Sequence, residues 1–146
     1  MKKLKFSINI KASKEKIWSV LWDDKSYRVW TSVFSQGSYV QTDWKEGSKV
    51  LFLTPKGDGM YSEIVTNRPN EFMAFKHIGE VKNSKEQPID EKTSTWTGSL
   101  ENYLLQNEGE FTKLIVELDA FADFQDYFNE TFPKALEKVK ELSEKP

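Results

Sequence analysis

Near its C-terminus the chain carries a stripe of large apolar side chains at helical spacing. Its members recur every three or four residues and are Phe121, Phe124, Tyr127, Phe128, Phe132, Leu136, Val139 and Leu142. Before this stripe, apolar and polar residues alternate with the period of two that is typical of β-strands. A long helix with an aromatic face needs a broad, curved sheet to lie on. Because large side chains are difficult to fit into such a groove without gaps, the pattern favours a domain that encloses a cavity.

Length and composition exclude several classes of protein. A chain of 146 residues suits a single domain, 1–146, with one hydrophobic core. The formal net charge of -2 and the presence of only two arginines, Arg28 and Arg68, disfavour a nucleic-acid partner. There is no cysteine, which excludes disulfides and thiolate catalysis and fits a cytoplasmic location. No stretch approaches the ~20 apolar residues of a membrane span, and no signal-peptide run is found at the N-terminus.

The first part of the chain predicts one strand followed by two short helices. Residues 3–11 alternate in the manner of a half-buried strand. Ser13 offers an N-cap for a helix over 14–22, and the Asp23-Asp24 pair ends that helix. A second helix follows, with the apolar side chains Tyr27, Trp30 and Phe34.

The rest of the chain predicts strands and turns up to the final helix. Strand patterns occupy residues 37–43, 49–52, 60–65, 71–78, 94–105 and 110–119. The polar stretch 79–93 predicts a long mobile loop. Pro133 lies inside the final helical pattern and removes the hydrogen bond to the Asn129 carbonyl. We therefore expect the last helix to kink or to split in two at this proline.

Several short motifs follow one another in a characteristic order. Residues 12–21 read Ala-Ser-Lys-Glu-Lys-Ile-Trp-Ser-Val-Leu, a small-residue opening followed by a helix with a hydrophobic-Trp pair. The later motifs are Asp23-Asp24, Trp30, Gly47, Glu63-Ile64 with Pro69, and the helical segment 135–140. In order and spacing the chain resembles the helix-grip superfamily (START-like, SRPBCC, birch-pollen-allergen-like). Within it, the chain looks closest to bacterial proteins similar to the C-terminal domain of the activator of heat-shock protein 90 ATPase.

This resemblance implies an α+β helix-grip fold. Such a fold has a curved antiparallel sheet of six or seven strands, two short helices after strand one, and a long C-terminal helix packed across the sheet. The resemblance also implies a hydrophobic cavity between the sheet and that helix. One departure concerns His77, because the strand that ends with Lys76-His77 typically ends with an aromatic residue in the family.

Side chains that can carry chemistry are sparse. His77 is the only histidine, so a histidine zinc site cannot form, and no serine lies in a nucleophile-elbow sequence. Carboxylates such as Glu101 and Asp119 fall largely at caps, turns or outward strand positions, where solvated carboxylates belong. The sequence therefore predicts no catalytic residue, no metal and no cofactor, and it favours a protein that is not an enzyme.

Assigning the polar side of each strand outward leaves a set of mainly aromatic residues that face the last helix. The predicted ligand-binding residues are Trp30, Phe34, Phe52, Ile64, Phe75, His77, Trp96, Leu100, Phe124, Tyr127 and Phe128. Polar groups that can orient a ligand at the rim are Tyr103, Asn102, His77 and Ser62. The same aromatic residues can instead interdigitate as a solid core, and the resemblance favours the cavity.

The sequence leads to one preferred function and two alternatives. The preferred function is binding of an apolar small molecule or lipid-like ligand between the sheet and the C-terminal helix, in a protein that is a monomer or weak dimer. The first alternative is an interaction module for a chaperone or another protein, and the second is an enzyme of the polyketide cyclase type. An enclosed pocket favours ligand binding, a filled core with exposed aromatics favours the module, and a buried histidine or acid at the pocket favours the enzyme.

Overall fold

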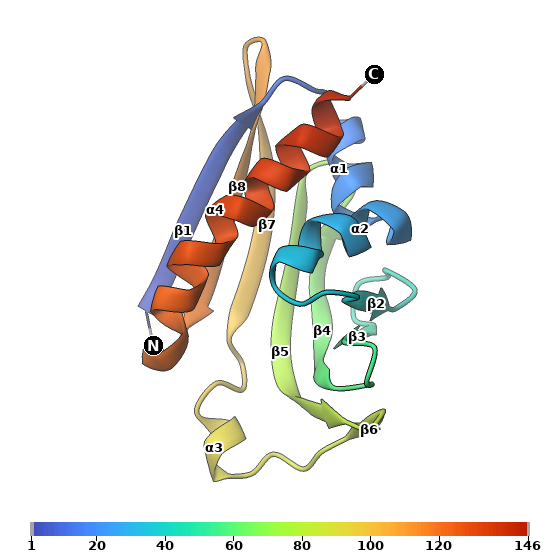
Figure 1. Cartoon of the computed structure of the whole chain (residues 1–146), viewed down its shortest axis with the longest axis vertical. Coiled ribbons are helices and arrows are strands. Elements are labelled where there is room, and N and C mark those ends of the chain that lie inside the picture. The colour runs from blue at the N-terminus through green and yellow to red at the C-terminus, as the bar shows by residue number, and fades with distance from the viewer. Residues whose placement is uncertain (1, 146) are drawn as a thin grey trace.

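The computed structural model describes residues 2–145 and consists of one antiparallel sheet with helices on one of its faces (Figure 1). The strands are β1 (Lys2–Ile10), β2 (Tyr39–Gln41), β3 (Lys49–Leu53), β4 (Gly59–Arg68), β5 (Phe72–Lys82), β6 (Lys85–Glu86), β7 (Leu100–Glu108) and β8 (Phe111–Ala120). The helices are α1 (Lys14–Trp22), α2 (Asp24–Trp30), the 3-10 turn η1 (Thr31–Val33), α3 (Glu91–Ser94) and α4 (Ala122–Glu144). This arrangement confirms the predicted fold class.

The strand order in the sheet is β1-β8-β7-β5-β4-β3-β2, and the short β6 pairs with β5. Helix α4 runs diagonally across β1, β8 and β7, while α1 and α2 cover the neighbouring part of the same face (Figure 1). Ser13 caps α1 as predicted, with its Oγ accepting a hydrogen bond from the Lys16 amide at 3.1 Å. No helix within residues 2–145 combines the length and the apolar character that crossing a membrane requires.

The structure corrects the sequence prediction in two neighbouring segments. The predicted loop 79–93 begins as strand, because β5 continues to Lys82 and turns through Asn83 and Ser84 into β6. Both turn residues have positive φ, 52° and 64°, as a tight turn between paired strands requires. The predicted strand 94–105 begins only at Leu100, after the short helix α3 and a turn. Alternation alone could not place this boundary, since Trp96 between two threonines in the turn continues the apolar–polar alternation.

Helix α4 is continuous from Ala122 to Glu144, so of the two outcomes expected at Pro133, a kink or a split, the split does not occur. From Phe132 onward the helix packs against the sheet. The ring of Phe132 stacks on that of Phe6 in β1 with centroids 5.2 Å apart, and Leu136 and Val139 are buried. The N-terminal half is different, because Phe124 and Tyr127 are 52% and 42% exposed. The apolar side of α4 is thus part of the core in the C-terminal half of the helix, whereas in the N-terminal half it is partly exposed to solvent.

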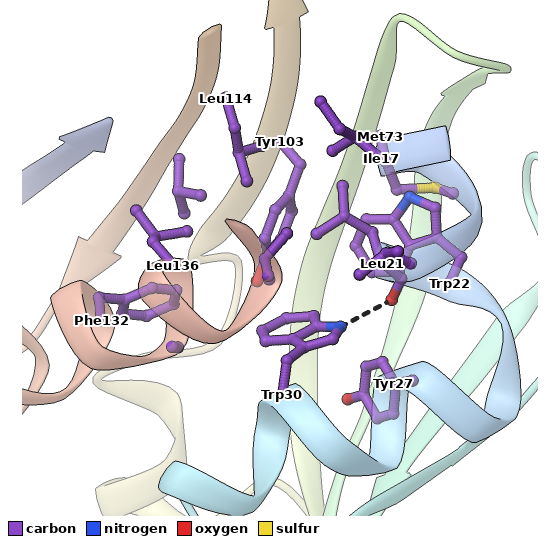
Figure 2. Packing of buried hydrophobic residues seen from close by; sticks show 14 of the residues in the cluster. Ile17, Leu21, Trp22, Tyr27, Trp30, Met73, Tyr103, Leu114, Phe132 and Leu136 are labelled. Atoms are coloured by element: carbon purple, nitrogen blue, oxygen red, sulfur yellow. Dashed lines mark hydrogen bonds between the residues drawn. The ribbon is translucent and has the colours of Figure 1, made fainter. Parts of the chain in front are cut away.

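The two short helices are held together by a buried tryptophan. The indole Nε1 of Trp30 in α2 donates a hydrogen bond to the Leu21 carbonyl of α1 at 3.1 Å (Figure 2). Trp30 also packs edge-on against Tyr27 and against Tyr103 of β7. Since an indole is both large and a donor, it fixes the angle between the helices while filling the space beneath them. This fixes the helical side of the space beside α4.

We predict that stability depends on the C-terminal half of α4. Leu136→Ala should lower the free energy of unfolding by about 2–5 kcal/mol, because a fully buried side chain is removed and a void remains. Lys134→Ala, two residues earlier and on the exposed face, should change it by less than about 0.5 kcal/mol. Urea unfolding followed by circular dichroism measures both values. Equal, small effects would contradict the packing described for this half of the helix.

Candidate functional site

A cavity of about 700 Å³ lies between the sheet and the helices. Its walls come from α1, α2 and η1 on one side, β3, β5 and β7 below, and the N-terminal half of α4 on the other side. Many of the lining side chains are aromatic, and they include Trp22, Trp30, Phe52, Phe75 and Phe128. The volume is within the range of about 300–1,000 Å³ that is typical of small-molecule pockets.

The structure brings together ten of the eleven residues that were predicted to contact a ligand. The residues on the cavity wall are Trp30, Phe34, Phe52, Phe75, His77, Trp96, Leu100, Phe124, Tyr127 and Phe128. Ile64 is fully buried but is not part of this wall, because it is taken up by the core. Of the polar candidates, His77 and Tyr103 line the cavity, whereas Asn102 and Ser62 do not. That these residues contact a ligand stays a prediction.

Two exposed aromatic side chains of α4 form the rim of the cavity. Phe124 and Tyr127 both line the cavity and both reach solvent. The Tyr127 hydroxyl donates a hydrogen bond to the Phe34 carbonyl at 3.1 Å, which joins α4 to the segment after η1 across the rim. The rings of Phe34 and Tyr127 also meet edge-on. The rim therefore consists of large, flat side chains held by one hydrogen bond between separate elements.

One stretch of the wall is polar and hydrogen-bonded from end to end. His77 of β5 lies between two partners: its Nδ1 is 2.7 Å from the Ser62 Oγ, and its Nε2 is 3.0 Å from Oε1 of Glu101. The other carboxylate oxygen of Glu101 accepts a hydrogen bond from the Tyr103 hydroxyl. Pairing of the strands creates this chain, because Ser62 lies opposite His77 and Glu101 lies opposite Phe75. Because a carboxylate only accepts hydrogen bonds, Nε2 of His77 carries the proton that is donated to Glu101.

The electrostatics of this wall favour an ionised glutamate and neutral tyrosines. Burial alone would raise the pKa of Glu101, but the hydrogen bond and charge of His77 and the hydrogen bond from Tyr103 together lower it below its ordinary value. Burial, followed by the nearby Glu101 charge, raises the pKa of Tyr103. The same two causes raise the pKa of Tyr27, which also lines the cavity. On this stretch of the wall, the Glu101 carboxylate thus faces the cavity beside the phenolic hydroxyls of Tyr27 and Tyr103.

This arrangement limits the chemistry that is possible. Ser62 has no exposed surface and does not line the cavity, so its hydroxyl cannot attack a molecule held there. Glu101 and His77 do line the cavity and can accept or donate a proton. Within residues 2–145, no three side chains of the His, Cys, Asp and Glu types gather in a way that could hold a metal ion.

Glu101 is the site residue that the sequence reasoning missed. It was assigned to the outward face of its strand, whereas the structure places it on the inward face with Tyr103 and Leu105. The alternation in this strand is ambiguous, because leucines at 100, 104 and 105 give both faces apolar residues. A charged residue was therefore placed toward water by default. The signal that could have corrected this lies in His77, a lone histidine on an inward face that needs a polar partner.

Three further tryptophans lie at or beside the cavity wall. Trp96 is expected in a strand but lies in the turn between α3 and β7, from which it still reaches the cavity wall. Trp22, at the end of α1, is buried and packs against Trp44 at 5.4 Å between ring centroids. Trp44 itself is half-buried. Because they pack on one another, Trp22 and Trp44 support the wall and do not form an exposed pair.

The sequence matches no known family profile and no curated protein. Solved structures do match. They include the Aha1 dimer from Colwellia psychrerythraea, with a TM-score of 0.75, 21% identity and coverage of 99% of this chain and 97% of that one. Protein MLL2253 from Mesorhizobium loti matches with a TM-score of 0.73 and 15% identity, over 97% of this chain and 96% of that one. DynU16, from the dynemicin biosynthetic locus, matches with a TM-score of 0.67 and 10% identity, over 95% of this chain and 46% of that one.

The chain has the helix-grip fold. The matches extend over nearly all of its length, and they include an Aha1 structure, which agrees with the resemblance found in the sequence. At identities of 21% and below, they establish the architecture and leave function to be argued from the site.

We predict that Glu101 makes stability depend on pH. Because its pKa in the folded protein is lower than its ordinary value of 4.5, ionised Glu101 stabilises the fold above about that pH, and the contribution is lost as the pH falls through the folded-state pKa. The difference in unfolding free energy between wild type and Glu101→Gln should therefore shrink from pH 7 toward pH 3. Urea titrations at several pH values measure it. Glu117→Gln, on the opposite face of the sheet, is the control, and a difference that does not change with pH would contradict this role.

Proposed function

We propose that this protein binds an apolar small molecule or lipid-like ligand in the cavity between the sheet and α4. The observation that carries the proposal is the cavity of about 700 Å³ with its largely aromatic wall, left open beside the N-terminal half of α4. A domain with no ligand would gain stability by closing this space with the same helix. Instead, Phe124 and Tyr127 stay exposed at the rim, where an incoming apolar molecule can cover them.

Burial of apolar surface supplies the affinity. A ligand that buries ~300 Å² of apolar surface gains roughly 7 kcal/mol at about 25 cal/mol per Å², before the costs of association are subtracted. Flat rings such as Phe75 and Phe128 offer faces and edges to aromatic or aliphatic ligands alike. The aromatic residues of the wall therefore recognise a ligand by its shape and apolar surface, and further selectivity has to come from the few polar groups of the wall. We place this binding protein in the cytoplasm, as a monomer or weak dimer.

A second candidate function is catalysis by proton transfer on a molecule held in the cavity. The observation that favours it is the His77–Glu101 hydrogen bond on the cavity wall, the kind of buried histidine and acid that an enzyme of the polyketide cyclase type would use. DynU16, which shares the fold, is a protein of a biosynthetic locus. If binding is the function, an apolar ligand recovered from the protein should be chemically unchanged after prolonged incubation. A changed ligand would favour the enzyme.

A third candidate, interaction with a chaperone or another protein, draws on the fold shared with the Aha1 dimer. It predicts a filled interior with the aromatic residues turned outward. The cavity argues for ligand binding ahead of this alternative, because most of the aromatic set faces inward.

Native mass spectrometry of freshly purified protein tests the proposal first, and we expect a bound small molecule. Titration with an apolar probe, followed by tryptophan fluorescence, tests it further, because Trp22, Trp30 and Trp96 line the cavity. We expect saturable quenching with one site. No co-purified mass together with no saturable probe binding would count against the proposal.

A pair of variants separates the cavity wall from the core. Phe128→Ala removes a wall ring, so it should weaken probe binding about fivefold, equivalent to about 1 kcal/mol, with a smaller effect on stability. Leu136→Ala is the control in the core, because Leu136 is fully buried and does not line the cavity. It should lower the unfolding free energy by about 3 kcal/mol and leave probe affinity unchanged. The opposite pattern would place the binding site elsewhere.

A further inference from the structure

We propose that the cavity selects apolar ligands whose polar end donates hydrogen bonds, amines above all, and that it rejects the corresponding carboxylates. The inference rests on the proposed function and names the class of ligand at the same site. It starts from the polar wall formed by His77, Glu101 and Tyr103, a hydrogen-bonded part of the cavity where a ligand's polar end can be matched.

The hydrogen-bond donors of this wall already have partners, whereas its acceptor oxygens have capacity left. The Nε2 proton of His77 and the hydroxyl proton of Tyr103 are both donated to Glu101, so neither is free for a ligand. The carboxylate can accept about four hydrogen bonds and receives two from these partners. Its side chain is 21% exposed, and since Glu101 lines the cavity, a molecule inside can reach it. The wall therefore has spare acceptors, while two of its donors are already committed.

The charge on the wall points in the same direction. Besides Glu101, the lining carboxylates are Glu80, Asp119 and Asp123, whereas Lys92 is the one lysine or arginine among the lining residues that the structure describes. Asp119 forms an ion pair with Lys3 at 3.3 Å and accepts a hydrogen bond from the Leu100 amide, and Glu80 forms an ion pair with Lys82 at 3.7 Å, so cations outside the cavity lining partly balance these two charges. A fatty carboxylate would therefore meet four lining carboxylates and one lysine.

An ammonium group fits where a carboxylate does not. A cation that leaves water needs a counter-charge and hydrogen-bond acceptors, and Glu101 supplies both inside a largely apolar cavity. A neutral alcohol or phenol can donate to the same oxygen without the benefit of opposite charge. The expected order of affinity is therefore amine first, alcohol second and carboxylate last, for the same apolar body.

Three probes with one alkyl chain test this order: dodecylamine, 1-dodecanol and dodecanoate, each at submicellar concentration and pH 7. Binding is measured by tryptophan fluorescence and checked by calorimetry. We expect dodecylamine to bind at least tenfold more tightly than dodecanoate, with dodecanol between them. This ranking uses the wild-type protein, so it does not depend on any variant folding.

Glu101→Gln then assigns the preference to this side chain, since it keeps the shape and an acceptor but removes the charge. We expect dodecylamine affinity to fall about tenfold, dodecanol affinity to stay within threefold, and dodecanoate affinity to rise. Glu117→Gln is the matched control, because Glu117 lies on the next strand and does not line the cavity. It should change none of the three affinities.

The outcomes separate this inference from the function on which it rests. Equal affinities for the three probes, or tighter binding of dodecanoate, would overturn the inference and leave cavity binding standing. An unchanged amine preference in a folded Glu101→Gln variant would also overturn it. If no probe binds to folded wild-type protein, both the inference and the proposed function fail.

Discussion

The structure depends on the amphipathic helix α4, which packs on the sheet with one half and borders the cavity with the other. From Phe132 onward α4 packs on the sheet: Phe132 stacks on Phe6 of β1, and Leu136 and Val139 are buried. The contact between α4 and β1 fixes the helix over one side of the sheet. The sheet is too broad for that helix to cover, so α1 and α2 fill part of the remaining face. The space left between them is the cavity, and the exposed rings of Phe124 and Tyr127 follow directly from it.

The polar wall depends on strand register in the same way. Ser62 and His77 face each other across β4 and β5, and Glu101 faces inward because it lies opposite the inward-facing Phe75 of β5. A shift of one residue in β7 would replace Glu101 and Tyr103 on the inner face by their neighbours and leave His77 without its carboxylate. The hydrogen bonds from His77 and Tyr103 offset the cost of burying the glutamate charge, so these three residues form one unit.

Much of the fold could be predicted from the sequence, because α1, α4 and β1 have strong periodicities and the element order is characteristic. The aromatic wall could also be predicted, since large rings on the inward faces of the strands must lie in the core or beside a cavity. The polar wall could not be predicted. Leucines on both faces of β7 hide its register, and the partners of Glu101 come from positions that only the folded chain brings together. Trp96 shows a related limit, since a turn can deliver a side chain to the wall as well as a strand can.

We propose above all that the space beside α4 holds an apolar molecule against the aromatic wall. Intermolecular nuclear Overhauser effects between the protein and bound 1-dodecanol are the decisive measurement, because they report which side chains touch the alkyl chain. We expect contacts to the rings of Phe75, Trp96 and Phe128 and none to Leu136, which lies in the half of the helix that packs on the sheet. Contacts confined to side chains outside the cavity, such as the exposed Phe111, would contradict it.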